Sequence, residues 1–177
     1  MPSGPTTPRG TSAWMSPSVR SRTVSNQRSA ARWSAMKESG PMPEATRTLI
    51  AGEAHGEILE LDEPLSFWGG FESETGTIID QAHPQVGQSL VGKIVMMTVG
   101  RGSSSASSVL AEAIRDGTAP AALILQESDE IIVLGAIVAD EIYGTVMPIL
   151  LVDDATYRDV ASLTAAQISA DGQIDPR

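Results

Sequence analysis

Cysteine is absent from the sequence, and histidine occurs only at His55 and His83. The chain therefore forms no disulfide, offers no thiolate nucleophile and holds no zinc–thiolate or cysteine-ligated iron–sulfur centre. Aromatic residues make up only 4% of the sequence, so a buried core must be built from aliphatic side chains. Nothing in the composition argues for export, and we expect a cytoplasmic protein.

Long apolar runs and basic residues are also scarce. The most hydrophobic region, AALILQESDEIIVLGAIVA, is interrupted by Gln126, Glu127, Asp129 and Glu130, which predicts no membrane span. Residues 1–42 hold six basic residues and one acidic residue, whereas the rest of the chain holds six basic and 21 acidic residues. The strongly acidic part of the chain after residue 42 repels phosphate groups, and we therefore expect no nucleic-acid partner.

The first part of the chain differs from the rest in composition and in sequence pattern. Residues 1–45 are rich in Ser, Pro, Thr and Arg and show no periodic apolar pattern, which predicts disorder. Three interpretations are open: a transit-like segment, a basic arm, or upstream sequence that is read as protein although translation starts at Met36 or Met42. We favour the last. The length suits a single domain, which we place at residues 46–177.

The pattern after residue 46 is that of an α/β domain. Apolar runs of strand length occur at residues 94–99, 121–126 and 147–153. Helical spacing of apolar residues predicts a helix over residues 104–116, ended by Gly117. A strand–helix–strand succession with short joints predicts parallel strands joined by a right-handed crossover.

Four further segments complete a predicted mixed sheet with few helices. TLIAGEAHGEILELD predicts one or two strands with a turn or bulge near His55 and Gly56, and EPLSFWGGFESETGTIID is mostly loop with a short strand at its end. EIIVLGAIVAD predicts a strand bent at Gly135. DDATYRDVASLTAAQ predicts a C-terminal helix capped by Asp153 or Asp154.

The helix entrance GRGSSSASSVL, residues 100–110, carries more serine than a helix start requires. One serine at the N-cap satisfies a free backbone N–H, and serine within the first turn lowers helix propensity. The surplus comprises Ser103, Ser104, Ser105, Ser107 and Ser108. A plain cap and a functional anion site are the two interpretations, and the spacing does not separate them.

The functional interpretation gives the stretch a chemistry. Backbone N–H groups at a glycine-rich helix entrance bind anions, Arg101 adds a fork for carboxylate or phosphate, and a serine there can act as base or nucleophile. The stretch is neither a Walker motif nor a Gly-x-Ser-x-Gly elbow. A hydrolytic pair with His83 is a weaker alternative, because AHP is more typical of a turn.

The stretch SFWGGF is the second unusual feature. Its aromatic side chains surround a double glycine and form either a plug over the core or a surface patch for a partner. Phe67 and Trp68 are therefore the candidate interface residues.

Four segments form an ordered set of motifs: PLSFWGGFESETGTIIDQAHPQVGQSLVGKIV, GRGSSSASSVL, GTAPAALIL and GAIVADEIYGTVMPIL. Together they resemble the small subunit of aconitase X, which is the swivelling domain of a dehydratase. The resemblance implies a β/β/α swivel fold. In aconitase-like enzymes, a Gly-x-Gly-Ser-Ser turn presents a serine alkoxide that removes the proton next to a carboxylate. The resemblance implies that Ser103 is the base and that its neighbour Ser104 binds substrate; Gly102 and Arg101, the latter from its guanidinium fork, are the further candidate substrate-binding residues. The arginine that follows the two serines in aconitase is replaced by Ser105 here.

The resemblance also implies a partner. This chain has no cysteine to hold an iron–sulfur cluster, and we expect no cofactor in it. The cluster would lie on a large subunit that shares the active site, in a heterodimer or larger assembly. The family dehydrates cis-3-hydroxy-L-proline in bacterial members and mevalonate 5-phosphate in archaeal ones. SFWGG favours hydroxyproline, a small carboxylate. A mevalonate 5-phosphate dehydratase subunit and a non-catalytic anion-binding module are the alternatives.

Overall fold

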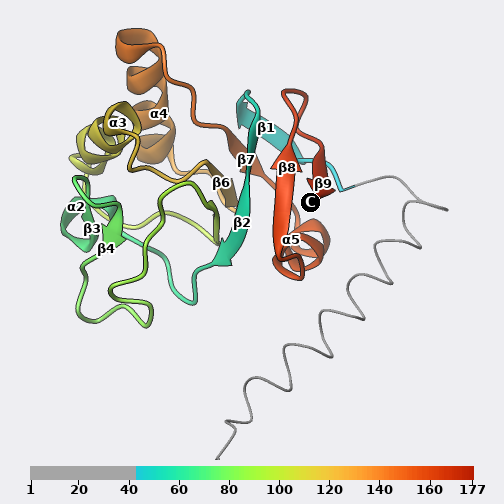
Figure 1. Cartoon of the computed structure of the whole chain (residues 1–177), viewed down its shortest axis with the longest axis horizontal. Helices are drawn as coiled ribbons and strands as arrows, with labels where there is room; N and C mark the ends of the chain where they lie inside the picture. The colour runs from blue at the N-terminus through green and yellow to red at the C-terminus, as the bar shows by residue number, and fades with distance from the viewer. Residues whose placement is uncertain (1–42) are drawn as a thin grey trace, which may run out of the picture.

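The computed structural model describes residues 43–177, and most of the predicted tail lies outside them. The main strands are β1 (Arg47–Ile50), β2 (Ala54–Glu60), β5 (Ile94–Met97), β6 (Ala122–Leu125), β7 (Ile149–Leu151), β8 (Ala165–Ile168) and β9 (Ile174–Pro176). They form one seven-stranded sheet in the order β1-β7-β6-β5-β2-β8-β9 (Figure 1). Strands β2, β5, β6 and β7 are parallel, and the outer strands pair antiparallel. The predicted α/β class with a mixed sheet is confirmed.

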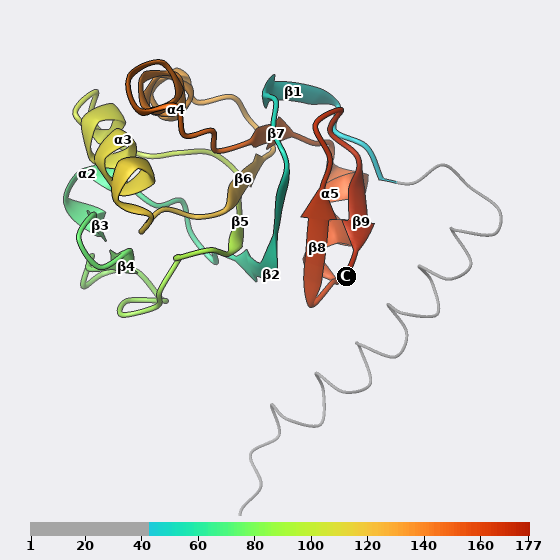
Figure 2. The same cartoon turned by 45° about the horizontal axis from the view of Figure 1, so that its top comes forward.

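Helices cover both faces of this sheet. They are α2 (Phe67–Gly70), α3 (Ala106–Asp116), α4 (Glu130–Tyr143) and α5 (Asp154–Ala161). Helices α3 and α4 lie together on one face, and α5 lies on the other (Figures 1 and 2). No helix within residues 43–177 is both long and apolar enough to cross a bilayer.

The central strands are buried on both sides, which explains their unbroken apolar sequences. In β5, Val95 and Met97 pack into the core beneath α3 and α4, whereas Ile94 and Met96 pack into the core beneath α5. The predicted strands at residues 94–99, 121–126 and 147–153 are confirmed, with shorter bounds.

The prediction for EIIVLGAIVAD is wrong, because this segment is helix α4 and not a bent strand. Its N-terminus is fixed by the Asp129 carboxylate, which accepts from the N–H groups of Ile131 and Ile132 at 2.9 and 3.2 Å. Apolar side chains lie on the outer as well as the inner side of α4, and Leu134 and Ile137 are exposed. The usual apolar stripe of a surface helix is therefore absent from the sequence.

Two further boundaries differ from the sequence-based expectation. His55 and Gly56 lie inside β2, where a Cβ on Gly56 would stand 2.5 Å from the Gly92 carbonyl oxygen. The chain reverses instead at residues 51–53. Of the two predicted caps of α5, Asp153 is the one the structure uses: its Oδ1 accepts from the Thr156 N–H at 2.8 Å. The helix ends earlier than predicted, and two unpredicted strands, β8 and β9, follow it.

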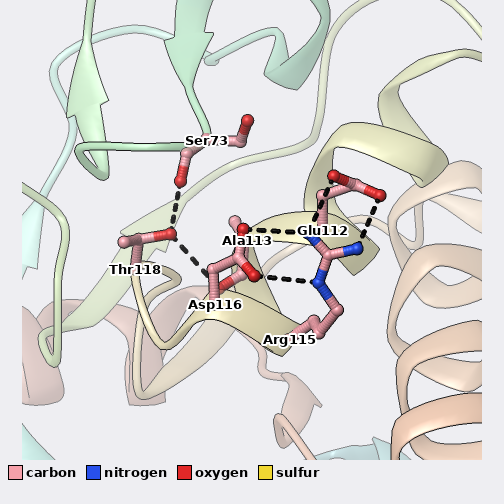
Figure 3. Close-up of polar contacts among 6 residues, drawn as sticks. All are labelled: Ser73, Glu112, Ala113, Arg115, Asp116 and Thr118. Atoms are coloured by element: carbon pink, nitrogen blue, oxygen red, sulfur yellow. Dashed lines mark hydrogen bonds and ion pairs between the residues drawn. The ribbon is translucent and has the colours of Figure 1, made fainter.

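The long segment between β2 and β5 is mostly loop, as predicted, with α2 and the small hairpin of β3 (Phe71–Glu72) and β4 (Thr77–Ile78) inside it. This hairpin is tied to the C-terminal end of α3. The Thr118 hydroxyl donates to the Ser73 carbonyl and to the Ala113 carbonyl (Figure 3). Next to it, Arg115 pairs with Glu112 and Asp116 across one turn of α3 (Figure 3). Helix α3 and the hairpin therefore form one unit.

The crossing of α3 and α4 depends on a glycine. A Cβ on Gly135 of α4 would lie 2.8 Å from the Ser107 carbonyl oxygen and 3.2 Å from the Leu110 Cβ of α3. The two helices consequently approach more closely than any side chain at this position allows.

Replacing Gly135 with Val should therefore lower the free energy of unfolding by about 1–3 kcal/mol, as expected for overpacking against backbone. Urea denaturation of the full chain measures this change. The matched control is Leu134→Val, which introduces the same side chain at the neighbouring, exposed position and should cost about 0.5 kcal/mol or less. Equal losses in the two variants would show that the close crossing is not needed for stability.

Candidate functional site

The serine turn, residues 100–105, connects the end of β5 with the start of α3. It lies at the edge where the parallel strands end, the usual place for ligands in sheets of this kind. The backbone N–H of Arg101 donates to the Leu65 carbonyl at 3.2 Å, which attaches the turn to the segment before α2. Gly102 has a φ of 125°, a conformation that glycine adopts without strain.

Gly102 also makes the closest contact of the turn. A Cβ there would lie 2.2 Å from the Ser66 Oγ. The Ser66 hydroxyl donates to the Trp68 carbonyl at 2.8 Å, so its oxygen is held in place beneath the glycine. The absence of a side chain at position 102 thus lets the turn rest on residues 65–68.

The serines at the entrance are exposed, except for the half-buried Ser107, and they are only partly used as caps. Ser105 is the N-cap residue but makes no side-chain capping bond. The Ser103 Oγ accepts from the Ser105 N–H at 3.3 Å, and the Ser107 hydroxyl donates to the Ser104 carbonyl at 2.8 Å. Ser103 and Ser104 are exposed to solvent, so both hydroxyls are accessible to a ligand.

Not every N–H group of the helix entrance is available for an anion. Those of Ala106 and Ser107 donate to the carbonyls of Ser103 and Ser104, at 2.9 and 3.3 Å. The N–H groups of Arg101 and Ser105 are also in use, on the Leu65 carbonyl and the Ser103 Oγ. An anion at this turn would therefore depend on the N–H groups of residues 102–104, on the hydroxyls and on the partial positive charge of the helix end.

Arg101 is already paired within the chain. Its Nη2 donates to the Asp80 Oδ2 at 2.9 Å, with side-chain exposures of 52% and 23%. An ion pair this exposed contributes about 1 kcal/mol or less to stability. The structure thus brings Asp80 to the serine turn, a residue that sequence reasoning missed because it lies 21 positions away.

The two candidate interface residues have opposite environments. Phe67 is 1% exposed and packs edge-on against Phe71, with ring centroids 5.2 Å apart. It is a core residue, which corrects its assignment to a partner surface. Trp68 is 57% exposed and remains the one aromatic side chain of this stretch that a partner could cover.

His83 is a buried structural residue. Its Nδ1 accepts from the Gln85 N–H at 3.1 Å, which leaves the proton on Nε2, where it is donated to the Glu63 carbonyl at 3.0 Å. Both ring nitrogens are therefore occupied, and the side chain is not free to serve as a base for a serine. His55 lies on β2 and lines a groove with Arg177 and Gln167, to which no residue of the serine turn contributes.

A groove of about 470 Å³ lies at the edge where the parallel strands end, and residues of α5 line part of it. Burial, together with the charge of Asp62, raises the pKa of Glu60, which lies in this groove. Burial and the charge of Glu60 raise the pKa of Tyr157 to about 12. The groove thus contains a carboxylate and a phenol that remains protonated at neutral pH.

The chain does not provide a metal or cluster site among its described residues. Within residues 43–177, no group of three or more His, Asp or Glu side chains is placed to hold a metal ion, and the sequence has no cysteine. Its residues do not fit an iron–sulfur cluster.

Comparison with known proteins gives consistent results. The family model described as "Aconitase X swivel domain" matches residues 44–175. A cis-3-hydroxy-L-proline dehydratase of Pseudomonas aeruginosa is 44% identical over 129 residues, which are 73% of this chain but 22% of that protein. The phosphomevalonate dehydratase small subunit of Methanothermobacter thermautotrophicus is 42% identical over 93 residues, 52% of this chain and 71% of that protein.

A solved structure also matches. The crystal structure of Thermococcus kodakaraensis aconitase X in its holo-form aligns with a TM-score of 0.65 and 32% identity, over 78% of this chain and 99% of that chain. The chain spans about a fifth of the length of the hydroxyproline dehydratases and most of the length of the small subunits that it matches. The fold, the ordered motifs and these similarities together show that this chain belongs to the aconitase X swivel domain family.

Proposed function

We propose that this chain is the swivel-domain component of a hydro-lyase and that Ser103 is the base of the reaction. The observation that carries this proposal is the exposed Ser103 hydroxyl on a turn that Gly102 fixes against Ser66, two residues after the half-exposed Arg101. The names of the similar proteins, which are dehydratases, support it.

We infer the reaction from the resemblance of residues 100–104 to the Gly-x-Gly-Ser-Ser turn of aconitase-like enzymes. Ser103 Oγ, in its ionised form, takes the proton from the carbon next to the substrate carboxylate. The electron pair of that C–H bond forms a C=C bond as the hydroxyl on the adjacent carbon departs, so that one water is lost overall. The N-terminal end of α3 stabilises the serine alkoxide, because the helix dipole is positive there. Arg101, Gly102 and Ser104 hold the substrate at the turn.

The rest of the active site would belong to a second polypeptide. The described residues of this chain do not fit an iron–sulfur cluster, so we assign the cluster to an aconitase X large subunit, where it would supply a Lewis acid for the hydroxyl that leaves. The reacting site would then lie where that subunit meets the serine turn. Trp68, whose carbonyl accepts from Ser66 beneath Gly102, is exposed, and so is Ile79, which follows β4 and donates its N–H to the Gly70 carbonyl at 2.8 Å.

Ser103→Ala should abolish most of the activity of the assembled enzyme. With the base removed, we expect kcat to fall by about 10²- to 10⁴-fold in the complex co-purified with its large subunit. Ser108→Ala, at an exposed position one turn further along α3, is the matched control and should keep kcat within about twofold. Near-normal turnover by an intact Ser103→Ala complex would reject the base assignment.

The substrate is a small hydroxylated carboxylate, and we propose cis-3-hydroxy-L-proline. The assembled enzyme should release water from this compound and not from mevalonate 5-phosphate. Parallel assays of the two compounds, with product identified by mass spectrometry, measure the preference. Turnover of mevalonate 5-phosphate alone would assign the chain to the other activity and leave the proposed role of Ser103 intact.

Trp68→Ala should weaken assembly. Exposed tryptophans that become buried at interfaces are frequent hot spots, so we expect Kd for the large subunit to rise by about tenfold or more, measured by calorimetry. Thermal unfolding of the isolated chain should not change, because Trp68 is exposed. Ile142→Ala removes an apolar side chain at the C-terminal end of α4 that is 66% exposed, and it serves as the control. An unchanged Kd for Trp68→Ala would place the interface elsewhere.

A further inference from the structure

We propose that Asp80 is a positioning residue of this site: it holds the Arg101 guanidinium beside the serine turn in the orientation that receives the substrate carboxylate. The inference rests on the proposed function, since it concerns the same turn. It adds a residue outside the glycine–serine motif and gives it a task distinct from proton transfer.

Asp80 is itself rigidly placed. Its Oδ1 accepts from the Ala82 N–H at 2.9 Å, and its carbonyl accepts from the His83 N–H at 3.1 Å. Its own N–H donates to the Gly70 carbonyl at 3.3 Å. The buried His83 ring connects this turn with the Glu63 carbonyl. The Oδ2 that meets Arg101 is therefore held on a turn fixed at several points.

Arg101 is consequently restrained at both ends. Its backbone N–H donates to the Leu65 carbonyl, and its Nη2 meets Asp80. A free arginine side chain samples many rotamers, and ordering it on ligand binding costs conformational entropy. The ion pair orders the side chain before a ligand arrives, which is the physical advantage of the arrangement.

The pair leaves room for a ligand. The contact with Asp80 uses one nitrogen of the guanidinium, whose other N–H groups lie in a side chain that is half exposed. A substrate carboxylate can bind these groups while the bond to Asp80 stays intact. A pair so exposed stabilises the fold little, so its loss should affect the site more than the fold.

Asp80→Asn is the variant that tests this role. Its amide oxygen can still accept from the Ala82 N–H, while the charge that holds Arg101 is gone. We expect the KM of the assembled enzyme for cis-3-hydroxy-L-proline to rise about tenfold, with kcat within about threefold of the wild type and unfolding temperature unchanged. The control Glu74→Gln makes the same chemical change at an exposed position of the β3–β4 turn and should leave KM unaltered.

A double-variant cycle shows whether Asp80 acts through Arg101. If it does, Asp80→Asn combined with Arg101→Ala raises KM no further than Arg101→Ala alone. The inference would be overturned if the KM of the double variant rose by the product of the two single-variant effects, or if Asp80→Asn alone left KM unchanged.

Binding measured without turnover separates this inference from the proposed function. Calorimetry on the Ser103→Ala complex, with and without Asp80→Asn, should show about tenfold weaker binding of cis-3-hydroxy-L-proline in the double variant. Equal affinities would refute the role of Asp80 even where Ser103 proves to be the base. Full turnover by Ser103→Ala would refute the base, whatever Asp80 does to affinity.

Discussion

The contact between Gly102 and Ser66 is the constraint on which the site depends. With no side chain at position 102, the turn after β5 rests directly on the loop before α2. That contact fixes where Ser103 emerges and which direction Arg101 can take. It also joins two segments more than thirty residues apart, so the site exists only in the folded chain.

The sheet explains why this turn is exposed on one side and firmly supported on the other. Strand β5 is buried on both faces and lies between β6 and β2, so the point where it ends is fixed by neighbours on each side. Helix α3 then leaves on one face, and its far end is attached to the β3–β4 hairpin through Thr118 (Figure 3). Both ends of α3 are thereby held to the segment between β2 and β5, through Leu65 at one end and Ser73 at the other.

Local sequence patterns predicted the parts of the fold that local physics controls. Strand β5 and helix α3 follow from an unbroken apolar run and from a helical stripe ended by Gly117. Helix α4 was missed because apolar residues surround it, which removes the period that distinguishes helix from strand. Phe67 and Trp68, adjacent and chemically similar, differ in burial only through tertiary packing. The pairing of Asp80 with Arg101 depends on packing in the same way, and no spacing rule predicts it.

The ends of the described chain lie side by side. The Ile174 N–H donates to the Pro43 carbonyl at 3.1 Å, and Glu44 bridges to Gln173. In both views this corner, near β9, lies across the molecule from α2 and α3 (Figures 1 and 2). Covalent linkage to another polypeptide at either end would thus leave the face that carries the serine turn unobstructed. One and the same fold can therefore serve as a segment of a long fused enzyme or as a freestanding short chain.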